Sequence, residues 1–298
     1  MTGFFTGLAT AMITPFHDNG GVNYEAFGEM IDRQIEGGTD VLVIAGTTGE
    51  PSTMTEQEIE DLMRFSVQYV AKRAMIVFGS GSNCTAKTVA ASIKAEKLGA
   101  DGLLVVTPYY NKCTQNGIYE YYRAVNDAVN IPFICYNVPP RTGVNILPAT
   151  MERIATLKNV AGIKEACGNM EQICETMRRI RGKCDMYSGD DNLNLPITAI
   201  GGSGLISVVS NLVPADVKKV FTLTKAGRLD EANAVQDRLL PLIDACFIEV
   251  NPIPAKAGAN LLGLHAGKPR APLTEMEPAH VETMRAVLEN YGLETIHD

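Results

Sequence analysis

The sequence predicts an α/β protein, a (β/α)8 TIM barrel with a C-terminal helical extension. Two observations support this fold class. Eight short β-rich runs alternate with amphipathic segments, and most runs are continuously apolar, as in parallel strands covered on both faces. An open doubly wound sheet is the alternative. That fold favours a Gly-rich phosphate loop after the first strand, and Ile13-Thr14-Pro15-Phe16 is not one.

The elements follow in order along the chain. Strands are expected at residues 8–13, 41–45, 75–79, 103–106, 132–136, 160–164, 185–188 and 205–209. Helical patterns cover residues 23–36, 55–70, 85–98, 118–128, 148–157, 170–180, 193–200 and 214–225. Thr55 and Glu58 form a capping box at the start of one helix, and Gly99 is a good C-terminal stop for the next.

Three more helices are expected after the barrel, at residues 228–247, 254–262 and 278–291. No stretch of low complexity separates them from the barrel, so we expect them to pack on it rather than to move independently. The predicted organisation is a barrel over residues 1–225 and a helical region over residues 226–298.

Composition and charge restrict the possible partners. The 298 residues are 46% hydrophobic and 20% charged, which is ordinary for a soluble globular protein. The formal net charge of −8 disfavours nucleic acids and anionic membranes, because both reward clustered Lys and Arg. No run approaches the roughly 18 apolar residues of a membrane span. The start of the chain has no basic flank and no sustained apolar segment, so no signal peptide is expected.

Cysteine and histidine usage bears on compartment and metal binding. The seven cysteines are scattered, odd in number and without a CxxC pair, which predicts reduced thiols in a cytoplasmic protein. The four histidines lie far apart, without HxH or HExxH spacing, which disfavours a histidine-based metal site. Neither a metal nor an organic cofactor is expected.

Polar and reactive residues gather at the C-terminal ends of the expected strands, where barrels carry their active sites. Lys164 ends the strand at 160–164. A lysine amine is a nucleophile only when neutral, and desolvation by apolar walls lowers its pKa enough to make that form accessible. Attack on a ketone then gives a protonated Schiff base, an electron sink for forming an enamine. The alternative is a lysine that is solvated or paired with Glu165.

Two further strand ends complement the lysine. Tyr136 follows an apolar strand and can shuttle a proton at an iminium carbon, or it is a core tyrosine with a satisfied hydroxyl. Thr47 and Thr48 lie between Gly46 and Gly49, in a turn whose amides suit a small carboxylate. The alternative is a plain glycine turn, because GxxG spacing alone is a weak signal.

Arg141 lies in a Pro-rich turn that would hold its guanidinium near the barrel mouth, where bidentate capture of a carboxylate suits it. Without the other motifs it would be interpreted as a surface arginine. Tyr109 and Tyr110 follow a proline and suit aromatic packing at a subunit contact. Asp190 and Asp191 suggest helix N-capping rather than a metal site, because companion ligands are missing.

Three motifs together match a known family. GTTGE at 46–50, YNVP at 136–139 followed by RTG at 141–143, and GIKE at 162–165 resemble the dihydrodipicolinate synthase / N-acetylneuraminate lyase family of pyruvate-dependent class I aldolases. The resemblance runs from residue 7 to about residue 292 and includes SGDD at 188–191 and NPIP at 251–254. Each motif alone is unspecific, and the set is highly specific.

The resemblance implies a role for each matching residue. Lys164 would form the Schiff base with pyruvate, and Tyr136 would donate and accept protons in a relay completed by Thr47 and Tyr110. In the family that second tyrosine reaches into the neighbouring subunit's site. The resemblance therefore implies an obligate homodimer, and commonly a homotetramer built as a dimer of dimers.

The remaining positions bear on the substrates. Thr48 and the backbone of Ile206 match positions that hold pyruvate. Arg141 matches the position that holds the carboxylate of aspartate semialdehyde, and lyases of sialic and sugar acids usually lack an arginine there. The resemblance thus implies condensation of pyruvate with aspartate semialdehyde, the first step towards diaminopimelate and lysine.

One region departs from lysine-inhibited members of the family. Their effector site uses histidines just after GTTGE and a glutamate after the third strand. Here Pro51, Glu56 and Ile59 stand in the first region, and Lys87 stands where the glutamate would bind the effector's ammonium. We therefore expect free lysine to inhibit weakly or not at all.

Three other functions compete with this interpretation. A lyase of 2-keto-3-deoxy sugar acids or N-acetylneuraminate would use the same enamine. A catalytically silent ligand-binding paralogue is disfavoured by the intact set of Lys164, Tyr136 and Arg141. A metal-dependent aldolase is disfavoured by the absence of a ligand cluster in the sequence pattern.

Overall fold

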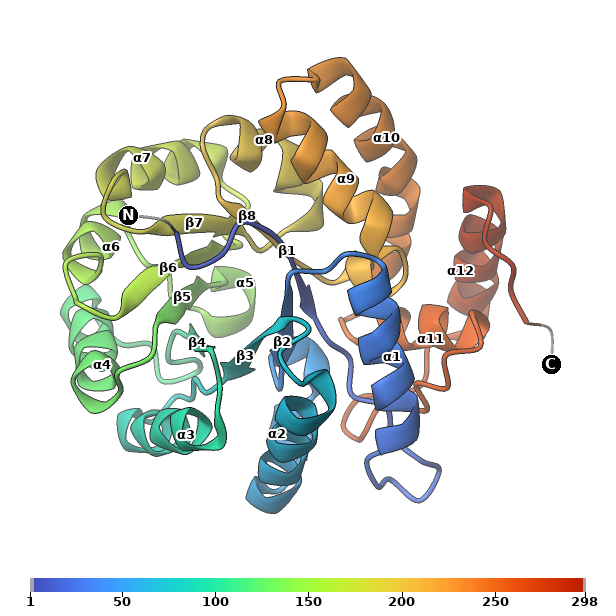
Figure 1. Ribbon diagram of the computed structural model, residues 1–298, viewed down its shortest axis with the longest axis horizontal. Coiled ribbons are helices and arrows are strands. Elements are labelled where there is room, and N and C mark those ends of the chain that lie inside the picture. Colours follow the sequence, from blue (N-terminus) through green and yellow to red (C-terminus); the bar gives the residue numbers. More distant parts are fainter. Residues whose placement is uncertain (1–2, 297–298) are drawn as a thin grey trace.

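The computed structural model describes residues 3–296 and confirms the predicted barrel (Figure 1). Eight parallel strands close in chain order, with β8 paired back to β1. The strands are β1 (Gly7–Ala11), β2 (Val41–Ile44), β3 (Met75–Gly79), β4 (Gly102–Val106), β5 (Phe133–Asn137), β6 (Val160–Glu165), β7 (Asp185–Ser188) and β8 (Gly204–Ser207). Met1 and Thr2, which begin the segment on which the signal-peptide expectation depends, lie outside the described residues.

Helices surround the strands, and α10, α11 and α12 group on one side of the barrel (Figure 1). The helices are α1 (Tyr24–Glu36), α2 (Glu56–Val70), α3 (Thr85–Leu98), α4 (Gln115–Ala128), α5 (Pro139–Thr142), α6 (Pro148–Ile154), α7 (Met170–Ile180), α8 (Asn194–Ala199), α9 (Pro214–Lys225), α10 (Leu229–Cys246), α11 (Ile253–Leu261) and α12 (Pro278–Tyr291). Short 3-10 turns are η1 (Thr47–Gly49), η2 (Pro51–Thr53), η3 (Asp191–Leu193) and η4 (Val209–Asn211).

Local sequence signals account for several helix ends. Thr55 and Glu58 form the expected capping box, each side chain accepting from the other's backbone N–H. Gly99 ends α3 at φ 97°, a left-handed conformation that glycine adopts without steric cost. The Pro-rich turn of Arg141 is the one-turn helix α5, because Pro139 at its first position fixes a helical φ and Gly143 ends it at φ 70°.

The barrel wall has two differently packed faces. Outward side chains pack beneath the helices, as the continuous apolar runs predict. Phe5 stacks on Tyr187 inside the barrel, with ring centroids 4.1 Å apart. Ala9 and Ala11 also point inwards, and Ala11 lines a cavity at the opposite, C-terminal end of the strands. Small side chains there leave room for a ligand.

The C-terminal helices reach back to the barrel mouth. Lys256 of α11 donates to Glu50 Oε1 over 2.8 Å, and the Asn251 side chain donates to Thr48 Oγ1 over 2.9 Å. The boundary between residues 225 and 226 stays a prediction. Over residues 3–296, no helix combines the length and the apolar character needed to cross a bilayer.

Candidate active site

Lys164 and Tyr136 lie side by side at the C-terminal ends of β6 and β5. The two residues are register partners across the parallel pair. They are 5% and 7% exposed, and Lys164 Nζ lies 4.3 Å from the centre of the Tyr136 ring. Gly189, at the end of β7, makes room for the lysine, because an added Cβ there would come within 2.9 Å of Lys164 Cε. The aliphatic stem of Lys164 therefore packs between the Tyr136 ring and Gly189.

The environment of Lys164 favours its neutral form. Burial lowers the pKa of Lys164 to about 8, the negative charge of Asp191 opposes the shift, and Arg141 adds to it. Glu165 faces the opposite side of the strand, where its carboxylate accepts from Asn137 Nδ2 over 2.9 and 3.2 Å. The alternative of a Lys164–Glu165 ion pair is therefore wrong, since successive strand residues point to opposite faces.

A second buried lysine shows what distinguishes Lys164. Burial also lowers the pKa of Lys256 to about 8, against the pull of Glu50. Its ammonium, however, bonds to Glu50 and to the carbonyl of Lys268, at 2.8 and 3.2 Å. Within residues 3–296, Lys164 Nζ forms neither an ion pair nor a hydrogen bond, and it borders a cavity. Lys164 is thus the buried lysine whose amine is left unbonded beside a cavity.

The Tyr136 hydroxyl stays protonated at neutral pH, because burial raises its pKa to about 12. The two other members of the expected relay are less close. Thr47 is exposed at the cavity rim, and Tyr110 is 88% exposed with φ 73°. Across the described part of the chain, no hydrogen bond joins Thr47 or Tyr110 to Tyr136. The relay therefore stays a prediction.

The GTTGE motif folds into η1 beside the cavity, and Thr48 is 3% exposed there. Gly49 is required by close packing, because an added Cβ would lie 3.2 Å from both the Met12 carbonyl and Thr14 Oγ1. Thr14 Oγ1 also donates to the Gly49 carbonyl over 2.8 Å. Ile206 is fully buried on the inner face of β8. The motif is thus a fixed turn rather than a flexible glycine loop.

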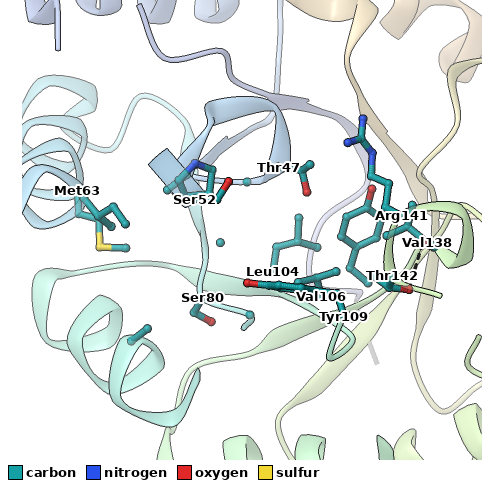
Figure 2. A pocket seen from close by; sticks show the side chains of 18 residues that line it. Thr47, Ser52, Met63, Ser80, Leu104, Val106, Tyr109, Val138, Arg141 and Thr142 are labelled. Atoms are coloured by element: carbon teal, nitrogen blue, oxygen red, sulfur yellow. Dashed lines mark hydrogen bonds between the residues drawn. The ribbon is translucent and has the colours of Figure 1, made fainter. Parts of the chain in front are cut away.

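A cavity of about 340 Å³ brings most of the predicted residues together. Its lining includes Lys164, Tyr136, Thr47, Thr48 and Arg141. A second cavity of about 390 Å³ adjoins it and shares Thr47, Tyr136 and Arg141. Figure 2 shows this second cavity, with Arg141 at one end and Met63 at the other. The first cavity is large enough for a three-carbon acid and a second small substrate.

Asn251 is a site residue that the sequence pattern did not single out. Its carbonyl accepts from Arg141 Nη2 over 3.1 Å, and its side chain donates to Thr48. Its Oδ1 atom is buried and has no hydrogen-bond partner among residues 3–296, and the residue lines the cavity. The NPIP motif was the available signal, but 203 residues separate Asn251 from Thr48.

The Asp190-Asp191 pair divides into two roles. Asp190 is the expected N-cap, and its carboxylate accepts from the Asn192 N–H over 3.2 Å. Asp191 is not a cap, which corrects the expectation for this residue, because its carboxylate bonds to β8 and the residue after it. Across residues 3–296, His, Cys, Asp and Glu side chains form no group of three that could hold a metal ion. The seven cysteines are unpaired.

The site thus has a buried lysine beside a buried tyrosine at the mouth of a barrel. A comparison with known families agrees with this arrangement. The family model described as the dihydrodipicolinate synthetase family matches residues 4–291. The chain belongs to the dihydrodipicolinate synthetase family.

Close relatives of this family cover nearly all of the chain. The 4-hydroxy-tetrahydrodipicolinate synthase of Caldicellulosiruptor bescii is 46% identical over 289 residues, which is 97% of this chain and 98% of the relative. The dihydrodipicolinate synthase of Aquifex aeolicus superposes with a TM-score of 0.96 at 40% identity, covering 98% and 100% of the two chains. The chloride-inhibited dihydrodipicolinate synthase of Acinetobacter baumannii, complexed with pyruvate, gives 0.95 at 35% identity, covering 97% and 99%.

Proposed function

We propose that the protein condenses pyruvate with L-aspartate 4-semialdehyde through a Schiff base on Lys164, which gives 4-hydroxy-tetrahydrodipicolinate for diaminopimelate and lysine biosynthesis. It is accordingly a lyase of the class I aldolase type. The observation that supports this most is Lys164 itself, which is buried, without an ionic partner, and open to a cavity. The pyruvate bound to the Acinetobacter baumannii relative also supports it.

The chemistry follows from the neutral amine. Lys164 attacks the ketone carbon of pyruvate, water leaves, and a protonated Schiff base forms. Loss of a methyl proton gives the enamine, whose carbon attacks the aldehyde of the second substrate. The substrate's own amine then displaces the lysine as the ring closes. Tyr136, protonated at neutral pH, carries protons to and from the reacting carbon and oxygen.

The two carboxylates of the substrates need separate partners. We assign the pyruvate carboxylate to Thr48, the amides of η1 and the backbone of Ile206. We assign the carboxylate of aspartate semialdehyde to Arg141, whose guanidinium is held at the cavity by the Asn251 carbonyl. The orphan Oδ1 of Asn251 offers an acceptor to the same substrate.

A lyase of sugar acids or N-acetylneuraminate is the rival enzyme. The relatives described above are synthases, which supports the synthase over this lyase. An assay of pyruvate with aspartate semialdehyde, run beside an assay of pyruvate release from those sugars, separates the two. Activity retained in EDTA excludes a metal-dependent aldolase.

The decisive experiment is borohydride trapping with pyruvate. Reduction should inactivate the enzyme and leave a pyruvate-derived adduct on Lys164, located by peptide mass spectrometry. Lys164→Ala should abolish both adduct and activity. Lys158→Ala is the matched control, because Lys158 is exposed near the other end of the same strand. An unmodified Lys164 in the trapped protein, or full activity in Lys164→Ala, overturns the proposal.

Arg141→Ala tests the choice of second substrate separately. The adduct with pyruvate should still form, somewhat more slowly because the charge of Arg141 also lowers the pKa of Lys164. The KM for aspartate semialdehyde should rise about tenfold or more, as expected for loss of a charge-assisted bidentate contact. An unchanged KM for the aldehyde would show that Arg141 does not bind this substrate.

We further propose a cytoplasmic homodimer or homotetramer. The unpaired cysteines support a reducing compartment. The 88% exposure of Tyr110, beside the half-exposed Tyr109, supports an interface on this face.

A further inference from the structure

We infer that Asp191 is a positioning residue that serves as the buried counter-charge of Lys164 and anchors the strand end carrying Ile206. The inference deepens the proposed function, because it rests on Lys164 being the Schiff-base lysine. It concerns a carboxylate that the proposed chemistry does not use.

The carboxylate of Asp191 ties the end of β7 to the end of β8. Asp191 is 3% exposed and opens η3, three residues after β7. Its Oδ1 accepts from Ser207 Oγ over 2.5 Å, and its Oδ2 accepts from the Val208 N–H over 3.0 Å. Ser207 and Val208 directly follow Ile206, the proposed pyruvate-binding position. The carboxylate therefore fixes the backbone on which pyruvate would rest.

Asp191 and Lys164 are both buried, and neither has an ionic partner. Within residues 3–296, no ion pair shorter than 4.0 Å includes either residue, whereas the buried pair Lys256–Glu50 is 2.8 Å long. Burying an isolated charge costs several kcal/mol. Two opposite charges on neighbouring strand ends offset part of that cost for each other, even without direct contact.

Other charged groups also surround the lysine. Arg141, Asp190 and Asp244 line the same cavity, and Glu165 is turned to the opposite face. Asp191 raises the pKa of Lys164 against burial, and Arg141 lowers it. Burial raises the pKa of Asp191 itself, while its bonds from Ser207 and Val208 lower it, and the nearby Asp190 raises it again.

A counter-charge at this place affects two steps in opposite ways. It favours the ammonium and so reduces the share of neutral amine. It also favours the iminium, which carries the same positive charge in the same buried position. Forming the iminium joins the lysine nitrogen to the ketone carbon, takes up one proton and releases the carbonyl oxygen as water. The positive charge thus stays near the negative charge of Asp191, which stabilises it.

Asp191→Asn separates charge from hydrogen bonding. The amide is isosteric, and after a turn about its last bond its oxygen accepts from Val208 and its nitrogen donates to Ser207. The titration of Lys164 is read by competitive labelling with acetic anhydride over a pH series, followed by mass spectrometry. We expect its midpoint to fall by about one pH unit. The equilibrium constant for forming the pyruvate adduct should fall about tenfold, because the same negative charge also stabilises the iminium.

Ser207→Ala is the complementary variant, because it removes the hydroxyl that donates to Asp191 and accepts from the Ser210 N–H, and it keeps the carboxylate charge. Its Lys164 midpoint should stay at the wild-type value while the KM for pyruvate rises several-fold. A midpoint that is unchanged or raised in folded Asp191→Asn overturns the inference. Should that variant not fold by circular dichroism, Asp191→Ser, which also removes the charge, provides the same measurement. The labelling needs no pyruvate, so it distinguishes failure of this inference from failure of the proposed function.

Discussion

At the scale of single residues, the reactivity of Lys164 follows from the absence of partners as much as from burial. With a pKa of about 8, about one amine in ten is neutral at pH 7, against fewer than one in a thousand for an ordinary lysine. Lys256 shows the opposite case, because Glu50 and a carbonyl occupy its ammonium. A desolvated lysine becomes a nucleophile only where the surrounding residues leave its nitrogen unbonded.

The pH dependence of adduct formation tests this at the residue scale. Only the neutral amine attacks, so the trapping rate should rise with pH and reach half its plateau near pH 8. Tyr136 should cause no decline below about pH 11, because its pKa is about 12. Initial rates of borohydride trapping at saturating pyruvate measure the profile. A midpoint near the ordinary lysine value would show that burial does not activate Lys164.

The sequence was sufficient for residues whose motif and strand position agree, and it missed residues defined by distant contacts. Lys164, Tyr136 and Arg141 were predicted because the C-terminal ends of barrel strands converge. The unpaired oxygen of Asn251 and the bonds of Asp191 depend on side-chain orientation, which no periodicity encodes. Tyr110 was predicted as a catalytic residue, yet within this chain it points to solvent.

At the scale of elements, the C-terminal helical region holds the turn that binds pyruvate in our proposal. Glu50 follows η1 in the left-handed conformation, with φ 58°, and is 3% exposed. Its two oxygens accept from Lys256 of α11 and from the backbone N–H of Arg270, each over 2.8 Å. A glutamate backbone in the left-handed conformation is strained by about 1 kcal/mol or more, and these hydrogen bonds hold Glu50 in it despite that strain.

Removing one partner of this pair should destabilise the whole fold. Lys256→Met leaves the Glu50 charge buried, and we expect the free energy of unfolding to fall by about 3–5 kcal/mol. The double variant Glu50→Gln/Lys256→Met removes both charges and should recover much of that loss. Guanidinium unfolding followed by circular dichroism measures both. If the free energy of unfolding falls equally in the single and double variants, the destabilisation comes from losing the ion pair itself and not from the unpaired Glu50 charge.

The elements flanking the second cavity bear on regulation by lysine. Pro51 and Ile59 line this cavity with apolar surface, while Lys87 is exposed in the first turn of α3. An ammonium needs acceptors, and Lys87 would repel it. We therefore expect weak or no inhibition by free lysine in a steady-state assay. Half-inhibition below about 1 mM lysine would contradict this, since it requires several kcal/mol of binding free energy.

At the scale of the whole molecule, the barrel was predictable because its repeat is visible in the hydrophobic pattern. Strand bounds differ from expectation by at most two residues, and β5 and β6 each extend by one residue, to Asn137 and Glu165. What the pattern of a single chain cannot encode is its assembly. Tyr110 is 88% exposed and held at φ 73°, and in our proposal it serves a partner's site.

Mixing two inactive variants tests whether this tyrosine acts across an interface. Lys164→Ala and Tyr110→Phe should each be nearly inactive. If Tyr110 serves the partner's site, a mixed dimer has one site that holds both Lys164 and the partner's hydroxyl. Statistical re-association of equal amounts should then restore about a quarter of wild-type activity. Native mass spectrometry of the mixture, which must show heterodimers, controls for subunit exchange. No recovery of activity in a mixture that contains heterodimers would place Tyr110 in its own subunit's site or outside catalysis.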